Sequence, residues 1–116
     1  MMNQYKLFKA GIETNDGIRR FNGNAAMYEK YLFGFAEDPH FAALCEALEA
    51  RNATAAFAAA HALKGVAGNL SLTELHKDIV PLVEELRAGS FERAAELLEP
   101  VKEDYQKIMA ALQDHA

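Results

Sequence analysis

A single histidine, His61, lies in a stretch of sequence that almost entirely lacks charged side chains. Between Ala53 and Leu70 the only charged residue is Lys64, three positions after His61. A neutral imidazole carries a nucleophilic lone pair near neutral pH. On a helix, residues three apart place their Cβ atoms about 5–6 Å from one another, so the charge of Lys64 would attract an anion carried on the ring. This pair of residues indicates a phosphoryl acceptor.

Two glycines follow the histidine within the same predicted helix. Helical side chains tilt toward the N-terminus, so a side chain at position 65 would lean over His61, and Gly65 has none. Gly68 clears the next turn in the same way. Each glycine costs a helix about 1 kcal/mol relative to alanine, which suggests that access to this surface is needed.

The opposite side of the same helix is continuously apolar. At 3.6 residues per turn, one face collects Ala56, Ala59, Ala60, Leu63, Val66, Ala67 and Leu70. His61 lies roughly 200° from Leu63 around the helix axis. The outer face carries Thr54, Phe57, Ala58, His61, Lys64, Gly65 and Gly68. A solvated face usually carries Lys, Glu and Gln, so this composition favours a surface that another protein touches.

The run His61-Ala-Leu-Lys64-Gly65-Val-Ala-Gly68-Asn69-Leu70 resembles the signature of histidine-containing phosphotransfer (HPt) domains, the intermediate carriers of multistep two-component phosphorelays. Residues 18–24, 27–28 and 31–33 resemble the lead-in and first bundle helix of that family, and residues 72–86 resemble the helix after the phosphorylated one. Ser71 departs from the glycine that is usual after Asn-Leu. We expect Ser71 and Glu74 to form a capping box for the next helix.

The resemblance implies a role for each residue of the motif. His61 would be phosphorylated on Nε2, Lys64 would stabilise the phosphate, and Gly65 and Gly68 would keep the site open. The expected partners are receiver domains of response regulators and of hybrid sensor histidine kinases, and the receiver would supply the Mg²⁺, so that the chain itself needs no cofactor. We expect a small partner-binding patch made of Phe57, Ala58, Gly65, Gly68 and Asn69, although Asn69 fits equally well as a helix C-terminal residue.

The apolar residues recur with a helical period along nearly the whole chain. Short leading helices are predicted at residues 4–10 and 15–21. The first bundle helix begins at the N-cap Asn24 and stops near Glu37, where Asp38-Pro39 is typical of a new helix start, and its stripe continues to residue 51. The remaining helices are predicted at residues 53–68, at 71–88 and after a cap at Ser90. The predicted fold is all-α, an antiparallel four-helix bundle with short N-terminal leading helices.

Length and composition agree with one domain over residues 1–116, with a lead-in at 1–23 and the bundle at 24–114. Apolar residues make up 51% of the chain and the net charge is −5, which argues against nucleic acid or an anionic membrane as a partner. The single cysteine, Cys45, cannot form an internal disulfide. No signal peptide or membrane-spanning run is evident, so we expect a cytoplasmic monomer.

Two other function classes remain open from the sequence. One is an adaptor that binds a protein through the same face without being phosphorylated. The other is a helical enzyme or metal protein, although His40, His76 and His115 have no convincing set of ligands nearby and no metal site is expected. A phosphate-binding loop of the Gly-x-x-x-x-Gly-Lys type is absent, so the chain is predicted to be a phosphocarrier and not a kinase.

Overall fold

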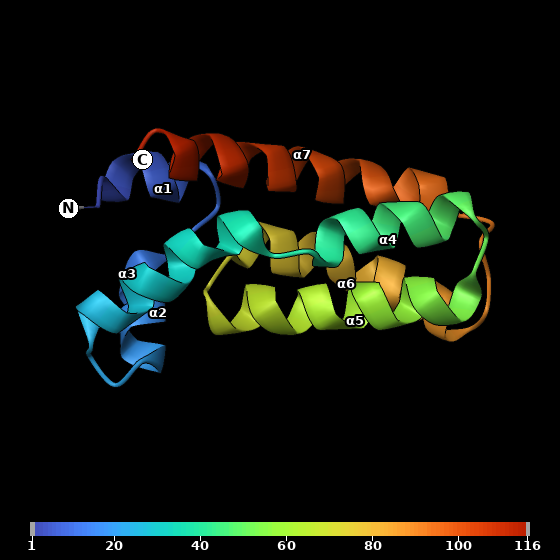
Figure 1. Cartoon of the computed structure of the whole chain (residues 1–116), viewed down its shortest axis with the longest axis horizontal. Helices are drawn as coiled ribbons and strands as arrows, with labels where there is room; N and C mark the ends of the chain where they lie inside the picture. The colour runs from blue at the N-terminus through green and yellow to red at the C-terminus, as the bar shows by residue number, and fades with distance from the viewer. Residues whose placement is uncertain (1, 116) are drawn as a thin grey trace.

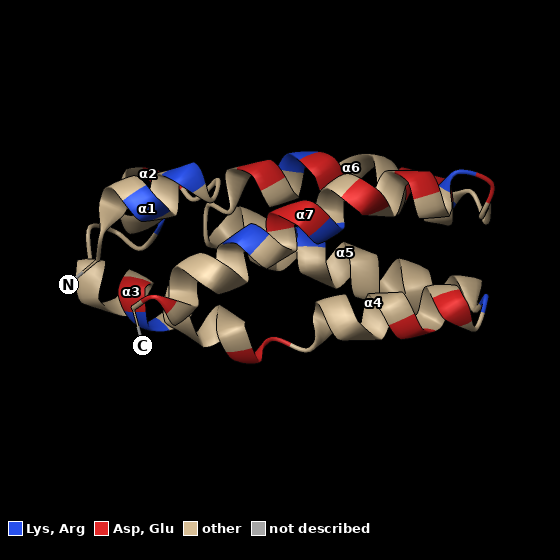
Figure 2. Cartoon of the chain, turned by 90° about the horizontal axis from the view of Figure 1, so that it is seen from above, with Lys and Arg blue, Asp and Glu red and all other residues tan. Residues whose placement is uncertain are grey.

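Four long helices form an antiparallel bundle in the computed structural model, which describes residues 2–115 (Figure 1). They are α4 (His40–Glu49), α5 (Ala53–Asn69), α6 (Thr73–Arg87) and α7 (Ala94–Gln113). Seen from above in Figure 2, α4 and α6 lie on opposite sides of the bundle and α7 covers its middle. The fold class predicted from the helical periodicity is confirmed. The predicted domain ends, Met1 and Ala116, lie outside the described residues.

The elements before the bundle are α1 (Gln4–Lys9), α2 (Thr14–Arg20), α3 (Ala25–Gly34) and the 3₁₀ turn η1 (Phe35–Glu37). The predicted cap Asn24 is present, whereas the predicted cap Asp38 lies one residue before the N-cap position of α4, which Pro39 occupies. The side chain of Asn24 accepts a hydrogen bond from the Met27 amide at 3.0 Å, and that of Asp38 accepts one from the His40 amide at 2.9 Å. The backbone becomes extended at Asp38, the residue before Pro39, so α3 and α4 are separate helices.

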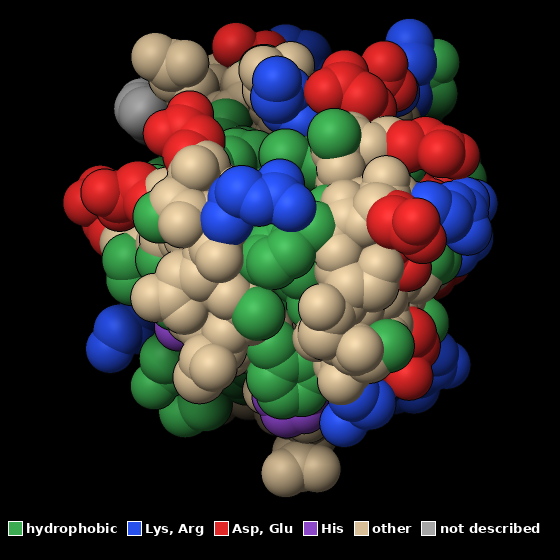
Figure 3. Space-filling view, turned by 90° about the vertical axis from the view of Figure 1, so that its right-hand side faces the viewer, with side chains coloured by type: hydrophobic (Ala, Val, Ile, Leu, Met, Phe, Trp, Pro, Cys, Tyr) green, Lys and Arg blue, Asp and Glu red, His purple; other side chains and the backbone are tan. Residues whose placement is uncertain are grey.

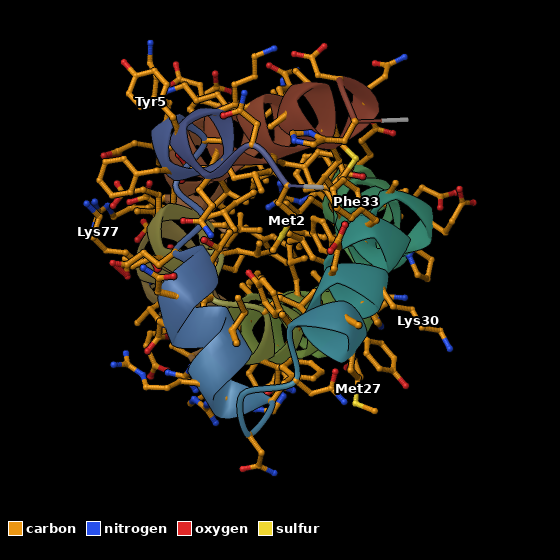
Figure 4. The ribbon with its side chains drawn as sticks, turned by 90° about the vertical axis from the view of Figure 1, so that its left-hand side faces the viewer. Met2, Tyr5, Met27, Lys30, Phe33 and Lys77 are labelled. Atoms are coloured by element: carbon orange, nitrogen blue, oxygen red, sulfur yellow. The ribbon has the colours of Figure 1, made fainter. Side chains whose placement is uncertain are left out.

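Helix α3 is fastened to the C-terminal end of α5 by Tyr28. The Tyr28 side chain is fully buried, and its hydroxyl donates a 2.7 Å hydrogen bond to the carbonyl oxygen of Leu70. Gly17 of α2 leaves room for this ring, because a Cβ there would overlap it. Figure 4 shows α2 and α3 diverging at this end of the molecule, with Met27 pointing outward from α3. The end of the histidine-bearing helix is therefore tied to α3, and α2 packs against the tyrosine that makes this link.

The core takes the predicted face of α5. Ala56, Ala60, Leu63 and Ala67 are fully buried, and Val66 is half-buried at the edge of the stripe. Alanine side chains are short, so α5 can lie close to both α4 and α6. Larger side chains from α6, including Leu75, Ile79 and Leu82, fill the centre of the bundle.

The predicted capping box of Ser71 and Glu74 is wrong. Ser71 has a φ of +57°, a left-handed conformation that favours glycine, and its Oγ donates to Asp16 Oδ2 at 2.6 Å. The first amides of α6 instead donate hydrogen bonds to the carbonyl oxygen of Gly11, from Thr73 at 2.8 Å and from Glu74 at 3.4 Å. The lead-in thus caps α6, and this pairing joins segments that are far apart in sequence.

The last helix also begins later than predicted. Ser90 does not cap it, because its Oγ accepts from the Glu92 amide at 3.2 Å before the helix starts at Ala94. The carboxylate of Glu85, from the end of α6, accepts from the Arg93 amide at 2.9 Å and from Ser90 Oγ at 2.8 Å. A side chain of the preceding helix therefore satisfies the start of α7.

One carboxyl group is buried between α6 and α7. Asp104 is 9% exposed, and its Oδ2 has no hydrogen-bond partner within residues 2–115. Burial, and after it the neighbouring Asp78, raise the pKa of Asp104 from 3.8 to about 7, against the smaller opposing effect of Lys107. Because the folded chain binds this proton more tightly than the unfolded chain, the resulting stabilisation is full below about pH 4 and is lost as the pH rises through about 7.

Replacing Asp104 by asparagine removes this titration. We expect Asp104→Asn to raise the free energy of unfolding at pH 8 by about 1–3 kcal/mol, with a much smaller effect at pH 4. Urea denaturation followed by circular dichroism at both pH values measures the difference. Glu103→Gln, at an exposed position of the same helix, is the control and should change little. An equal effect of Asp104→Asn at both pH values would contradict the assigned titration.

Candidate functional site

His61 lies near the middle of α5 on its exposed side. Within residues 2–115, the imidazoles that take part in hydrogen bonds are those of His40 and His115. The imidazole of His61 makes no hydrogen bond within these residues. Figure 3, which views the right-hand end of the molecule in Figure 1, shows histidine atoms at the lower edge, next to hydrophobic side chains and a basic one.

The bare face of α5, defined here as Phe57, Ala58, His61, Lys64, Gly65 and Gly68, is exposed or half-exposed throughout. In Figure 2 the visible ribbon of α5 is mostly tan, while acidic positions recur along α4 and both acidic and basic positions recur along α6 and α7. A surface of this kind presents backbone and small side chains to an approaching molecule.

The two glycines of the bare face differ in their surroundings. A Cβ added at Gly65 would meet nothing within 4 Å, so the space beside His61 is open. A Cβ added at Gly68 would contact the ring of His76, with 3.4 Å to its Cδ2. Gly68 also lines a hollow of about 300 Å³ together with Arg20 and Ser71. Gly65 thus leaves space for a partner, whereas a Cβ at Gly68 would make an ordinary contact with a side chain of α6.

Lys64 is half-buried and forms no ion pair within the part of the chain that the structure describes. Seven other basic side chains do form ion pairs with carboxylates there, among them Arg20, Lys77 and Arg87. An ammonium group with no carboxylate partner, one helical turn from His61, can interact with an incoming anion without first breaking an existing pair.

Phe57 is half-buried and contacts two functional groups at once. Its ring centroid lies 5.6 Å from that of His61, with 32° between the ring planes, and the guanidinium carbon of Arg87 lies 5.0 Å from the same centroid. An exposed cation–π contact contributes about 0.5–1 kcal/mol. The sequence did not indicate Arg87, because it belongs to the end of α6 and no local pattern links it to His61.

The other two predicted contact residues are exposed on α5. Ala58 is exposed one turn before His61, and Asn69 is exposed as the last residue of α5. Asn69 therefore does end the helix, as one of the two interpretations of this residue predicted. Its part in binding a partner stays a prediction.

Residues 2–115 hold no group of three or more potential ligand side chains that could bind a metal ion. His40 instead pairs with Asp38, with 2.9 Å between Nδ1 and Oδ1. None of the described helices combines the length and the apolarity needed to cross a bilayer.

Comparison with known proteins gives the family. The sequence model of the Hpt domain family matches residues 36–115, which contain α4, α5, α6 and α7 with the whole histidine motif. Searches of curated proteins and of solved structures found no match. The resemblance noted for residues 18–33 lies outside the matched span. On the strength of the matched bundle and the motif inside it, the chain belongs to the Hpt domain family, whose members carry phosphoryl groups in phosphorelay signalling and interact with receiver domains.

Proposed function

We propose that Nε2 of His61 accepts a phosphoryl group from the phospho-aspartate of a receiver domain and later passes it to another receiver. The observation that carries this proposal is the exposed imidazole of His61, which has no hydrogen-bond partner within the described residues and lies on a face without carboxylates. Family membership supports phosphotransfer in general.

The proposed step is an in-line displacement at phosphorus. The Nε2 lone pair forms the new P–N bond while the P–O bond to the aspartyl carboxylate breaks, and the carboxylate leaves with the bonding electrons. Nδ1 keeps its proton. The reverse step, with a carboxylate of the second receiver as nucleophile, restores the imidazole. The receiver supplies the Mg²⁺ and the remaining catalytic groups.

The neighbours of His61 have complementary tasks in this proposal. Lys64, which has no ion-pair partner among residues 2–115, offsets charge on the phosphoryl oxygens. Gly65 lets the receiver's active site close over the ring, and Phe57, Ala58, Gly68 and Asn69 extend the contact along α5. A small patch of this type fits a transient complex of modest affinity.

Replacing the histidine should stop labelling without stopping docking. We expect the wild-type chain to gain an acid-labile, alkali-stable label from a radiolabelled phospho-receiver, and His61→Gln to gain none while its affinity for the receiver changes little. Gel autoradiography and a binding titration measure the two properties. His76→Gln, a half-buried histidine on α6, is the matched control and should still be labelled. Label on His61→Gln would refute the assignment, and a wild-type chain that binds receivers without label would favour an adaptor.

The open space at Gly65 separates stability from function. Gly65→Ala should raise the free energy of unfolding by about 0.5–1 kcal/mol, because alanine favours a helix and the new Cβ meets nothing. The longer Gly65→Gln should slow phosphotransfer about tenfold or more by displacing the receiver. Thermal melts and single-turnover labelling measure the two effects.

Gly34 of α3, where a Cβ also meets nothing within 4 Å, is the matched control. Gly34→Gln should leave the labelling rate unchanged. Unaltered transfer to Gly65→Gln would show that the receiver does not approach over this glycine.

A further inference from the structure

We infer that Phe57 is a positioning residue for His61: its ring, held against the core and under Arg87, fixes the orientation of the imidazole. The inference rests on the phosphotransfer proposed above and adds to it a device within this chain that orients the nucleophile. It assigns Phe57 a task beyond contact with a partner.

The first step is the contact between the two rings. Phe57 and His61 are four residues apart on α5, so their side chains lie on the same side of consecutive turns. With 5.6 Å between centroids and 32° between planes, the rings form a tilted stack. An aromatic pair of this kind contributes about 0.5–1.5 kcal/mol beyond the area that it buries, so imidazole orientations that lose the contact are disfavoured. The stack therefore restricts the angles that the imidazole can adopt.

The Phe57 ring is itself held in place by the core and by α6. Its side chain is half-buried and packs against the core cluster. From α6, the guanidinium of Arg87 lies 5.0 Å from the ring centroid, and Arg87 Nε is in turn 3.4 Å from Glu84 Oε2. The phenyl ring therefore has contacts from both α5 and α6, whereas the aromatic contact of the imidazole comes from α5 alone.

Among the described residues, no hydrogen bond orients the imidazole of His61. Reactive histidines are commonly oriented by a hydrogen bond to the second ring nitrogen. In residues 2–115 His61 has none, since the hydrogen-bonded imidazoles belong to His40 and His115. The Nε2 lone pair lies in the plane of the ring, so in-line attack requires the phosphorus to lie in that plane, along the direction of the lone pair. Among the described aromatic contacts, the Phe57 ring is the one that His61 has.

The test compares Phe57→Leu, which keeps an apolar side chain for the core, with Phe57→Tyr, which keeps the aromatic ring. Phe91→Leu is the matched control: Phe91 is also half-buried under a guanidinium, that of Arg51 at 4.9 Å from its centroid, but forms no aromatic pair within residues 2–115. Thermal melts verify that each variant is folded.

Two measurements decide the inference. Side-chain couplings and ring contacts of His61, measured by NMR in the chain alone, should report one ring orientation in the wild type and in Phe57→Tyr, and averaging in Phe57→Leu. In single-turnover labelling, Phe57→Leu should lower the rate at saturating phospho-receiver about tenfold, in addition to any rise in the receiver concentration for half-maximal rate that follows from the lost docking contact. Phe91→Leu should match the wild type in both.

The contrary outcomes are distinct. An unchanged ring orientation in Phe57→Leu overturns the inference, and so does a variant that needs more receiver but reaches the wild-type rate, because Phe57 would then be a docking contact alone. If the wild-type chain takes no label from any receiver, the proposed function fails, while the NMR comparison still decides whether Phe57 orients the ring.

Discussion

The fold depends on one constraint: helix α5 must bury one face completely while leaving the opposite face bare. Short side chains such as Ala56, Ala60 and Ala67 bring α5 close to its neighbours, and Leu63 inserts into the core at the level of His61. Full burial of a leucine is worth about 1.5–3 kcal/mol. Because packing on this side fixes the rotation of the helix, it also determines that His61 and Gly65 point outward.

A helix held in this way can present an incomplete reaction centre. In the proposed function, the chain would contribute the nucleophile His61, the cation of Lys64, which has no carboxylate partner among residues 2–115, and a second cation at Arg87 next to Phe57. Around these, a net charge of −5 is carried mostly by the other helices. The phosphorus, the leaving group and the metal ion would all arrive with the partner. This division explains why a bundle with a convex, nearly uncharged helix can serve as a carrier in a relay.

The sequence predicted what depends on local periodicity. It gave α5 as residues 53–68, one residue short of the observed end, and placed His61 on the exposed side of the buried stripe. Long-range contacts were missed. Ser71 donates a hydrogen bond to Asp16 of the lead-in. The carboxylate of Glu85, in place of the predicted cap Ser90, accepts the hydrogen bond at the start of α7. The Arg87–Phe57 contact likewise joins two helices. Such pairings depend on how helices meet in space, which periodicity within one helix does not encode.

The central claim is that the bare face of α5 is where the receiver docks and the phosphoryl group is transferred. The most direct measurement is NMR mapping of the isotopically labelled chain during titration with a receiver held in its phosphorylated form by beryllofluoride and Mg²⁺. The largest shifts are predicted at Phe57, Ala58, His61, Lys64 and Gly65, with small ones along the outer side of α7. Shifts concentrated on α7 or α1, with α5 unaffected, would contradict the claim.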